Sequence, residues 1–228
     1  MKTKTLLIAA AALAAGVMSS QAQGVYSQNV VGYVNVPLTE GFNLIATPLD
    51  ADGTGTNNTV VGVYSNTLPV NSAIYTYSGG NYTIATYAKN KAGTSTNWTV
   101  NPYINPGLGY WLDIPVGSFG GGTSNVTIVG TVLQGALVNP AIAGAGYTIV
   151  ASQVPVAGSI TTNLNYYPSV NDTIYTYTGT GYNIYTYAKN KAGTSTNWTP
   201  SVPNINVGQG FWLNSSTGTA WTNNFIVQ

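Results

Sequence analysis

The chain contains one stretch of sequence twice, and the two copies lie 100 residues apart. Residues 87–99 read YAKNKAGTSTNWT, and residues 187–199 repeat those letters without a change. Related sequence precedes both copies, with AIYTYSGGNYTIAT at 73–86 and TIYTYTGTGYNIYT at 173–186. A repeat of this length exceeds the unit of a solenoid and has the size of a small domain. The sequence therefore predicts two tandem, homologous domains.

The N-terminal segment 1–22 has the features of a secretory signal peptide. Lys2 and Lys4 supply positive charge, an apolar run covers 6–17, and the segment ends in Ser-Gln-Ala22, which resembles a cleavage site. The apolar run is too short to span a bilayer, and no second run of that kind follows. We expect an exported protein that is secreted or held at the cell surface, with a mature chain starting at Gln23 and without a membrane span.

The chain is unusually poor in charged residues. They make up 5% of it, whereas about a quarter is typical. After the signal segment there are four Lys and five acidic residues, and Arg, His and Cys are absent throughout. A hydrophobic content of 44% is sufficient for a packed core. The lack of a basic patch argues against nucleic acid as a partner, and the lack of Cys excludes a disulfide scaffold.

The same composition argues against an enzyme. Without His and Cys, the Ser-His-Asp and Cys-His arrangements are excluded. Glycoside hydrolysis needs two facing carboxylates. The carboxylates are those of Glu40, Asp50, Asp52, Asp113 and Asp172. Asp113 becomes Asn214 in the second copy, so the two copies share no acidic site there, and we predict a protein that is not an enzyme.

The apolar pattern predicts strands along the chain. Alternating residues around a Gly-containing break predict a β-hairpin over 74–87, with a counterpart over 174–187. Further strands are expected at 30–36, 41–46, 109–112, 126–133, 146–151, 210–213 and 225–227, and short helical turns near 59–64 and 160–165. We predict an all-β fold of two small β-sandwich or barrel domains, 23–124 and 125–228. The 126–133 strand suits either the end of the first domain or the start of the second.

A comparison of the two hairpins suggests which face is buried. Tyr82, Ile84 and Thr86 recur unchanged 100 residues later, whereas Thr83 and Ala85 are replaced by Asn and Tyr. Because side chains alternate between the two faces of a strand, the unchanged set and the changing set lie on opposite faces. We expect the unchanged set to point into the core and to fix the register of the sheet.

Several of these segments resemble a module of secreted bacterial surface proteins. The segments are GFNLIATPL at 41–49, IYTY at 74–77, NPGLGYWL at 105–112 and NVGQGFWL at 206–213. In that module a G-[WF]-N-L-I strand is followed by an aromatic hairpin and a P-G-x-G-[YF]-W strand. YSQNVVGYVNV at 27–37 and VGTVLQG at 129–135 are similar to uncharacterised exported proteins of the Verrucomicrobia type. The resemblance implies export and a β architecture and carries no active site, and the second copy departs from it at Val207.

One segment resembles a calcium-binding loop. Asp50, Asp52, Thr54 and Asn58 occupy positions 1, 3, 5 and 9 of that pattern and offer the oxygen ligands that Ca²⁺ prefers. Position 12 is Val61 instead of the usual Glu, and the second copy has no acidic residue here. An ordinary Asp- and Gly-containing turn explains the segment equally well, so no cofactor is expected apart from this candidate Ca²⁺ site.

The repeated segment also concentrates the charge. All Lys residues after the signal lie there, and each copy ends in a Trp. These candidate contact residues are Lys89, Lys91, Trp98, Lys189, Lys191 and Trp198. The Lys pairs suit either an acidic partner or simple solvation of a loop. Exposed Trp98 and Trp198 rings would suit stacking on sugars, whereas Trp111 and Trp212, inside strands, are interpreted as packed residues.

These observations favour a secreted, non-enzymatic structural or surface protein that self-assembles or adheres. Self-association is expected through strand addition by residues 30–36 or 223–227, which lie at the two ends of the mature chain. The alternative is a carbohydrate-binding module that uses exposed Trp and Tyr on a surface polysaccharide.

Overall fold

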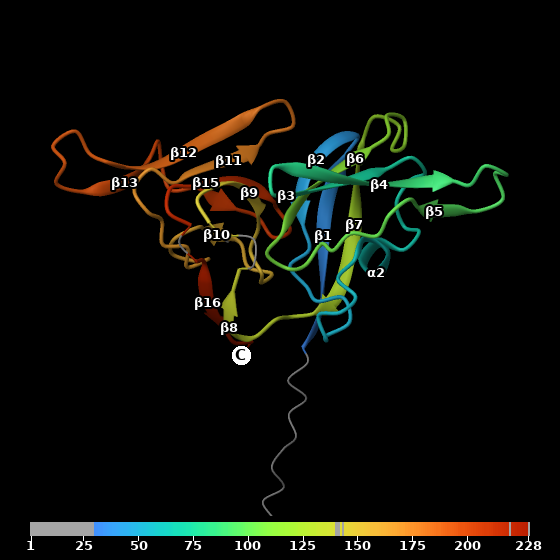
Figure 1. Cartoon of the computed structure of the whole chain (residues 1–228), viewed down its shortest axis with the longest axis horizontal. Helices are drawn as coiled ribbons and strands as arrows, with labels where there is room; N and C mark the ends of the chain where they lie inside the picture. The colour runs from blue at the N-terminus through green and yellow to red at the C-terminus, as the bar shows by residue number, and fades with distance from the viewer. Residues whose placement is uncertain (1–29, 140–141, 143, 219, 228) are drawn as a thin grey trace, which may run out of the picture.

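The computed structural model describes residues 30–139, 142, 144–218 and 220–227, so the expected signal segment lies outside the described residues. The described chain is all-β apart from one short helix, and it forms two similar halves (Figure 1). This arrangement confirms the predicted fold class. Among the described residues, no helix has the length and hydropathy needed to cross a membrane.

The first half consists of one five-stranded antiparallel sheet, a two-stranded ribbon and a helix. Its elements are β1 (Val31–Thr39), β2 (Gly41–Ala46), α2 (Val60–Tyr64), β3 (Ala73–Ser78), β4 (Asn81–Lys89), β5 (Thr96–Trp98), β6 (Gly109–Ile114) and β7 (Thr123–Thr131). The sheet has the order β2-β6-β3-β4-β5, and β1 and β7 form the ribbon. The helix confirms the helical turn expected near 59–64. The Thr59 hydroxyl caps it by accepting a hydrogen bond from the backbone N–H of Gly62 at 3.1 Å.

The second half repeats this plan. Its elements are β8 (Gly135–Val138), β9 (Gly146–Val150), β10 (Gly158–Ser159), β11 (Thr173–Tyr177), β12 (Tyr182–Lys189), β13 (Thr196–Thr199), β14 (Asn204–Ile205), β15 (Phe211–Ser215) and β16 (Thr222–Phe225). The sheet has the order β13-β12-β11-β15-β9, and β8–β16 and β10–β14 form short ribbons. Residues 160–164, where a helical turn was also expected, form turns.

Both terminal strands pair within the molecule. β1 runs antiparallel to β7 from the Val31–Thr131 pair to the Thr39–Thr123 pair. At the other end of the chain, β16 pairs with β8. β7 therefore closes the first half, and residues 125–131 lie with that half although the expected boundary falls at 124/125.

Each half has its own core beneath its sheet. In the first half, Ile74 and Leu112 of the sheet are fully buried and pack with Val36 and Ile128 of the β1–β7 ribbon. In the second half, the corresponding Ile174 and Leu213 pack with a separate set of residues that includes Tyr166 and Trp221. Burying one such side chain contributes roughly 1.5–3 kcal/mol, so each half is stabilised mainly by the inner face of its sheet.

The structure reverses the predicted faces of the hairpin. In β4, Ala85 is fully buried, whereas Tyr82 and Ile84 are 47% and 49% exposed. The register explains the reversal, because Ala85 lies opposite the core residue Ile74 and Ile84 lies opposite Tyr75. The expectation that Tyr82, Ile84 and Thr86 point inward is therefore wrong. The set that recurs unchanged between the copies lies on the outer face.

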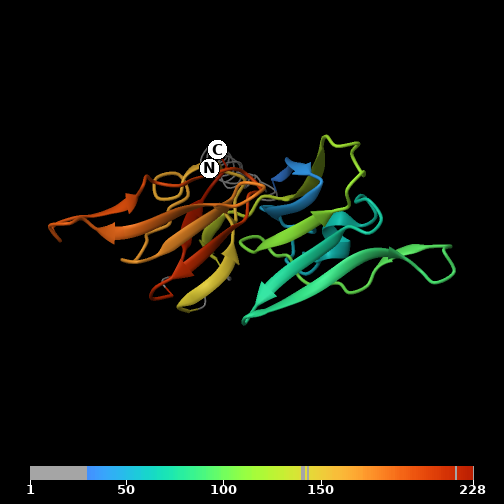
Figure 2. The same cartoon turned by 90° about the horizontal axis from the view of Figure 1, so that it is seen from above.

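The two halves are joined side by side through the Gly-x-Gly sequences 107–109 and 208–210. The backbone N–H of Ala46 in β2 donates to the carbonyl of Gly208 at 2.8 Å, and that of Ala151 after β9 donates to Gly107 at 3.0 Å. Each half therefore covers the inner sheet edge of the other, and Figure 2 shows the two sheets next to each other from above.

The joint is too tight for side chains at two glycines. A Cβ on Gly210 would lie 2.7 Å from the carbonyl oxygen of Ile45, and one on Gly109 would lie 2.5 Å from the Ile149 side chain. Glycine at these two positions permits the close approach of the two backbones.

Candidate functional site

The outer faces of the two sheets carry a large group of aromatic side chains, which we call the aromatic face. The first half contributes Phe42, Tyr75, Tyr77, Tyr82, Ile84 and Trp111. The second half contributes Tyr147, Tyr175, Tyr177, Tyr182, Ile184 and Trp212. The ribbons β1–β7 and β8–β16 lie on the other side of the sheets (Figure 1), so the described part of the chain leaves this face uncovered.

The register of the strands places these side chains in rows. In the first half, Trp111 lies opposite both Leu44 and Tyr75, and Tyr75 lies opposite Ile84. In the second half, Trp212 lies opposite Ile149 and Tyr175, and Tyr175 opposite Ile184. Directly opposed residues of antiparallel strands share one face, so each half builds the same Trp-Tyr-Ile row.

The rings form a connected network that crosses from one half to the other. Within the first half, Tyr82 lies 5.1 Å from Tyr77, measured between ring centroids. Across the joint, Tyr77 contacts Trp212 at 4.8 Å and Trp111 contacts Tyr177 at 4.8 Å, both in edge-to-face geometry. Edge-to-face pairs at this spacing contribute about 0.5–1.5 kcal/mol each, so the rings stabilise the joint and fix one another's positions.

The aromatic face contains two open hollows. The one over the first sheet has a volume of about 470 Å³ and includes Trp111 and Tyr177 in its lining. The one over the second sheet has a volume of about 400 Å³ and includes Trp212 and Tyr77. Tyr182 lines both hollows, so they adjoin each other. Each hollow thus combines rings from both halves.

The aromatic face is nearly uncharged but rich in hydroxyl groups. Partial burial raises the pKa of Tyr82 and of Tyr182. A hydrogen bond with Tyr147 raises the pKa of Tyr175. These hydroxyls stay protonated at neutral pH and can both donate and accept hydrogen bonds.

Among the described residues, Asp113 places a carboxyl on the same side of the first sheet as the aromatic face. It lies opposite Phe42 in the sheet, and burial raises its pKa. Its counterpart in the second half is the uncharged Asn214, which lies opposite Tyr147. The face therefore offers ring surfaces and hydroxyls with at most one charge.

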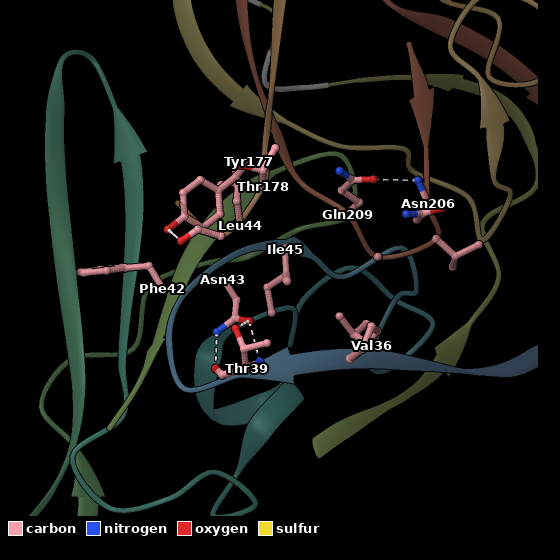
Figure 3. A pocket seen from close by; sticks show the side chains of 14 residues that line it. Val36, Thr39, Phe42, Asn43, Leu44, Ile45, Tyr177, Thr178, Asn206 and Gln209 are labelled. Atoms are coloured by element: carbon pink, nitrogen blue, oxygen red, sulfur yellow. Dashed lines mark hydrogen bonds between the residues drawn. The ribbon is translucent and has the colours of Figure 1, made fainter. Parts of the chain in front are cut away.

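A third hollow, of about 290 Å³, lies beside the joint between β2 and the 206–209 segment (Figure 3). Its buried Asn43 is used internally, since the amide nitrogen donates to Thr39 and Gly41 at 2.8 and 2.9 Å and the oxygen accepts from the Thr39 N–H. The side-chain oxygen Oε1 of Gln209 accepts from the backbone N–H of Asn206. These side chains hold the turns around the joint.

The candidate Lys residues lie at the tips of two hairpins. Lys89 and Lys91 are exposed at the β4–β5 tip, and Lys189 and Lys191 at the β12–β13 tip. The tips point toward opposite ends of the long axis (Figure 1). Equivalent hydrogen bonds of Asn90 and Asn190 hold the two turns. Lys89 ends β4 opposite Thr96 of the edge strand β5, and Lys189 ends β12 opposite Thr196 of the edge strand β13.

The structure packs the two candidate Trp residues against the protein. Trp198 is 6% exposed and belongs to the core of the second half. Trp98 is half-buried, and its indole N–H donates to the carbonyl of Ser65 at 2.8 Å. By contrast, Trp111 and Trp212, which the sequence suggested were packed residues, line the two hollows. Trp98, Trp111 and Trp212 are all partly exposed, and of these three the structure places Trp111 and Trp212 in the lining of a hollow.

The calcium-loop candidates lie in one turn whose oxygens accept hydrogen bonds from within it. The Asp52 carboxylate accepts from the N–H and hydroxyl of Thr54 and from the hydroxyl of Thr56. These bonds hold the pKa of Asp52 well below its usual range, with the Thr56 bond as the largest cause. Asp50 accepts from the Asp52 N–H, and Asn58 accepts from the Ala51 N–H. Within the described residues, no three acidic side chains gather as metal ligands. The arrangement resembles an Asp-rich turn.

Comparisons with family models, with curated proteins and with solved structures found no match for the chain.

Sequence reasoning missed the aromatic face. The signal for it was present in the repeat, because Tyr82 and Ile84 recur unchanged while the alternate positions of the same strand change. Identity at alternate positions shows that a face is shared by the two copies, but it does not show which face is buried.

Proposed function

We propose that this protein is a non-catalytic binding protein of the cell exterior whose aromatic face holds a neutral polysaccharide. The observation that carries this proposal is the continuous, half-exposed network of rings with its two hollows. Soluble proteins rarely leave a large apolar surface uncovered unless it binds a partner. The predicted export signal, the small number of carboxylates and the lack of His and Cys are consistent with binding outside the cell without catalysis.

The chemistry of the face favours sugars. The apolar faces of sugar rings pack on aromatic rings, and sugar hydroxyls need partners that both donate and accept hydrogen bonds. Trp111 and Trp212 supply rings in the hollows, and Tyr82, Tyr175 and Tyr182 supply protonated hydroxyls beside them. A purely hydrophobic partner would offer these hydroxyls no hydrogen bond beyond those they make with Trp111, Tyr147 and Trp212.

The distribution of charge favours a neutral sugar over an anionic one. The Lys residues that the structure describes belong to the two hairpin tips, which lie at opposite ends of the molecule, and the carboxyl of Asp113 lies opposite Phe42 of the face. A polyanion would meet no positive charge on the face and would be repelled by that carboxylate.

Self-assembly as a structural or surface protein remains our second proposal. Its expected route was strand addition through 30–36 or 223–227. β1 and β16 already have one partner strand each within the molecule, so a neighbouring molecule would have to use the second side of these strands. The aromatic face itself is the other surface through which two copies of the chain could associate.

Retention of the mature protein on insoluble cellulose, chitin, β-1,3-glucan and starch tests the proposal. We expect retention on at least one of these polymers, and a Trp111→Ala/Trp212→Ala variant should bind that polymer at least about tenfold more weakly, or about 1.4 kcal/mol. The matched control is Tyr33→Ala on the β1–β7 ribbon, whose side chain is 72% exposed and lies off the face. Circular dichroism and thermal unfolding check that each variant is folded.

Two results would overturn this proposal. One is the absence of retention on all four neutral polymers by the folded wild-type protein. The other is a concentration-dependent dimer in sedimentation that the Trp double variant abolishes, because a second copy of the chain would then occupy the face.

A further inference from the structure

The two hollows are built from equivalent residues. Tyr75, Tyr82, Ile84 and Trp111 have the same residue types at positions 175, 182, 184 and 212 in the second half. The aromatic residue at the edge of each sheet differs, with Phe42 in the first half and Tyr147 in the second. The face therefore presents nearly the same set of groups twice.

The contacts between the halves are reciprocal. Tyr77 contacts Trp212, and its counterpart Tyr177 contacts Trp111, both at 4.8 Å. The backbone bonds of the two Gly-x-Gly sequences are reciprocal in the same way, since each sequence accepts from the strand edge of the other half. Reciprocity of this kind is the mark of a two-fold relation between two units. The halves are thus related by an approximate two-fold axis within one chain.

The direction of this axis follows from the position of the face. Both hollows open on the same side and share Tyr182. A two-fold axis lying within the surface would place the two aromatic surfaces on opposite sides of the molecule. The axis must therefore run close to the normal of the aromatic face, between the two hollows.

From this geometry, and resting on the proposed function, we propose that the two hollows together bind one linear neutral polysaccharide chain in either of its two directions. A chain that crosses both hollows meets the Trp111 set and then the Trp212 set. Reversing the chain is equivalent to rotating the face about its own axis, so both directions make nearly the same contacts. A short oligosaccharide fills one hollow, whereas a longer one fills both with a single molecule.

The first test is the dependence of affinity on chain length. Titration calorimetry uses soluble oligosaccharides of increasing length cut from whichever of the four polymers the mature protein retains. Linking two adjoining subsites raises affinity by about 10² or more over a single subsite. We expect a rise of this size once the oligosaccharide spans both hollows, together with a change from two short ligands to one long ligand per protein.

The single variants Trp111→Ala and Trp212→Ala provide matched halves of one experiment. Each variant should remove most of the gain in affinity that comes with oligosaccharide length. The two losses of affinity should agree within about threefold, or about 0.65 kcal/mol. One short ligand should still bind to each variant. If only one of the two variants weakens binding, or if length has no effect, the spanning arrangement is overturned while the proposed function stands. If no polymer is retained, the proposed function fails first, so the two failures are distinguishable.

A spin label at the reducing end of the long oligosaccharide tests direction. With both directions populated, the label should broaden the indole N–H signals of Trp111 and Trp212 in NMR to a comparable degree. Assignment comes from the two single variants. Broadening of one of the two signals alone would overturn binding in both directions.

Discussion

Position 72 and its counterpart 172 show how a single difference between the copies changes the local structure. The carboxylate of Asp172 is fully buried and accepts hydrogen bonds from the Tyr166 hydroxyl at 2.6 Å and from the backbone N–H groups of Ser216 and Ser169 at 2.7 and 2.8 Å. Ser72 is equally buried, and its hydroxyl oxygen has no hydrogen-bond partner. The second half thus uses a buried carboxylate to hold two loops, whereas the hydroxyl at the same position of the first half holds none.

This difference predicts unequal costs for two matched substitutions. Asp172→Ala removes the acceptor of four hydrogen bonds, which come from the Tyr166 hydroxyl, the Ser169 N–H, and the N–H and hydroxyl of Ser216. We expect a loss of about 3 kcal/mol or more in the free energy of unfolding. Ser72→Ala removes no hydrogen bond and should change it by less than about 1 kcal/mol. Urea unfolding followed by Trp fluorescence measures both values. Equal losses would show that the carboxylate does not hold the two loops.

At the scale of the element, the sequence predicted the strands well because alternation and Gly-containing breaks are local signals. The structure confirms the hairpins around 78–81 and 178–181, the 41–46 strand and the helical turn near 59–64. The sequence could not predict which face of each strand is buried, because the alternation of side chains is the same whichever face points inward. The register with Ile74, a neighbour from another strand, decides that Ala85 is buried.

The candidate site was missed for a related physical reason. Core positions can change in a compensating way, as Ala85 becoming Tyr185 shows, since each half packs its own core. The exposed Ile84 stays the same in both copies, where no packing requirement explains its identity. The difference between a preserved core and a preserved surface becomes visible only when the other strands of the sheet are in place.

The Gly-x-Gly sequences make a prediction about the joint between the sheets. Gly210→Ala places a Cβ 2.7 Å from the carbonyl oxygen of Ile45, so the backbones must move apart. Overpacking of this kind costs about 1–3 kcal/mol, and the contact between Tyr77 and Trp212 should weaken with it. Differential scanning calorimetry should show a melting temperature that is lower by about 2–4 °C for each kcal/mol lost from the free energy of unfolding.

The control for this prediction is another glycine of the same half. A Cβ on Gly181 would meet open space. Gly181→Ala should therefore leave the melting temperature unchanged or raise it slightly, because the added stability is less than about 1 kcal/mol. The explanation of the joint fails if the two Ala variants melt at the same temperature.

At the scale of the whole molecule, each hydrophobic core belongs to one half, whereas the hollows of the aromatic face combine side chains from both halves. Each half has its own core, but the two hollows are complete only when both halves are joined, because Tyr177 completes the first hollow and Tyr77 the second. The joint therefore links the stability of the molecule to the shape of its candidate site. A variant that opens the joint, such as Gly210→Ala, should lose polysaccharide retention even if both halves stay folded.

The charged and titratable groups of the whole molecule predict how its stability depends on pH. Glu40 accepts backbone hydrogen bonds, the one from Gly117 being the largest cause of its lowered pKa, and hydroxyl bonds lower the pKa of Asp52. Carboxyl pKa values that are lower in the folded state stabilise the fold above about pH 4, and this contribution is lost as the pH falls through the folded values.

Burial raises the pKa of Tyr110 to about 12 and that of Tyr64 well above its usual value. A Tyr pKa that is raised on folding stabilises the fold below about pH 10, and this contribution is lost as the pH rises further.

Because the chain has no His, we expect a melting temperature that is nearly constant between about pH 5 and pH 9 and falls on both sides of that range. Thermal unfolding by circular dichroism between about pH 3 and pH 11 measures this profile. A Glu40→Gln/Asp52→Asn variant should flatten the acid side and leave the alkaline side unchanged, because the two sides arise from different groups. Polysaccharide retention should follow the same plateau, since the Tyr82 and Tyr182 hydroxyls of the face, whose pKa values are raised, keep their protons across it. A step in stability or retention between about pH 6 and pH 8 would show that a group other than these carboxyls and Tyr hydroxyls controls the fold or the face.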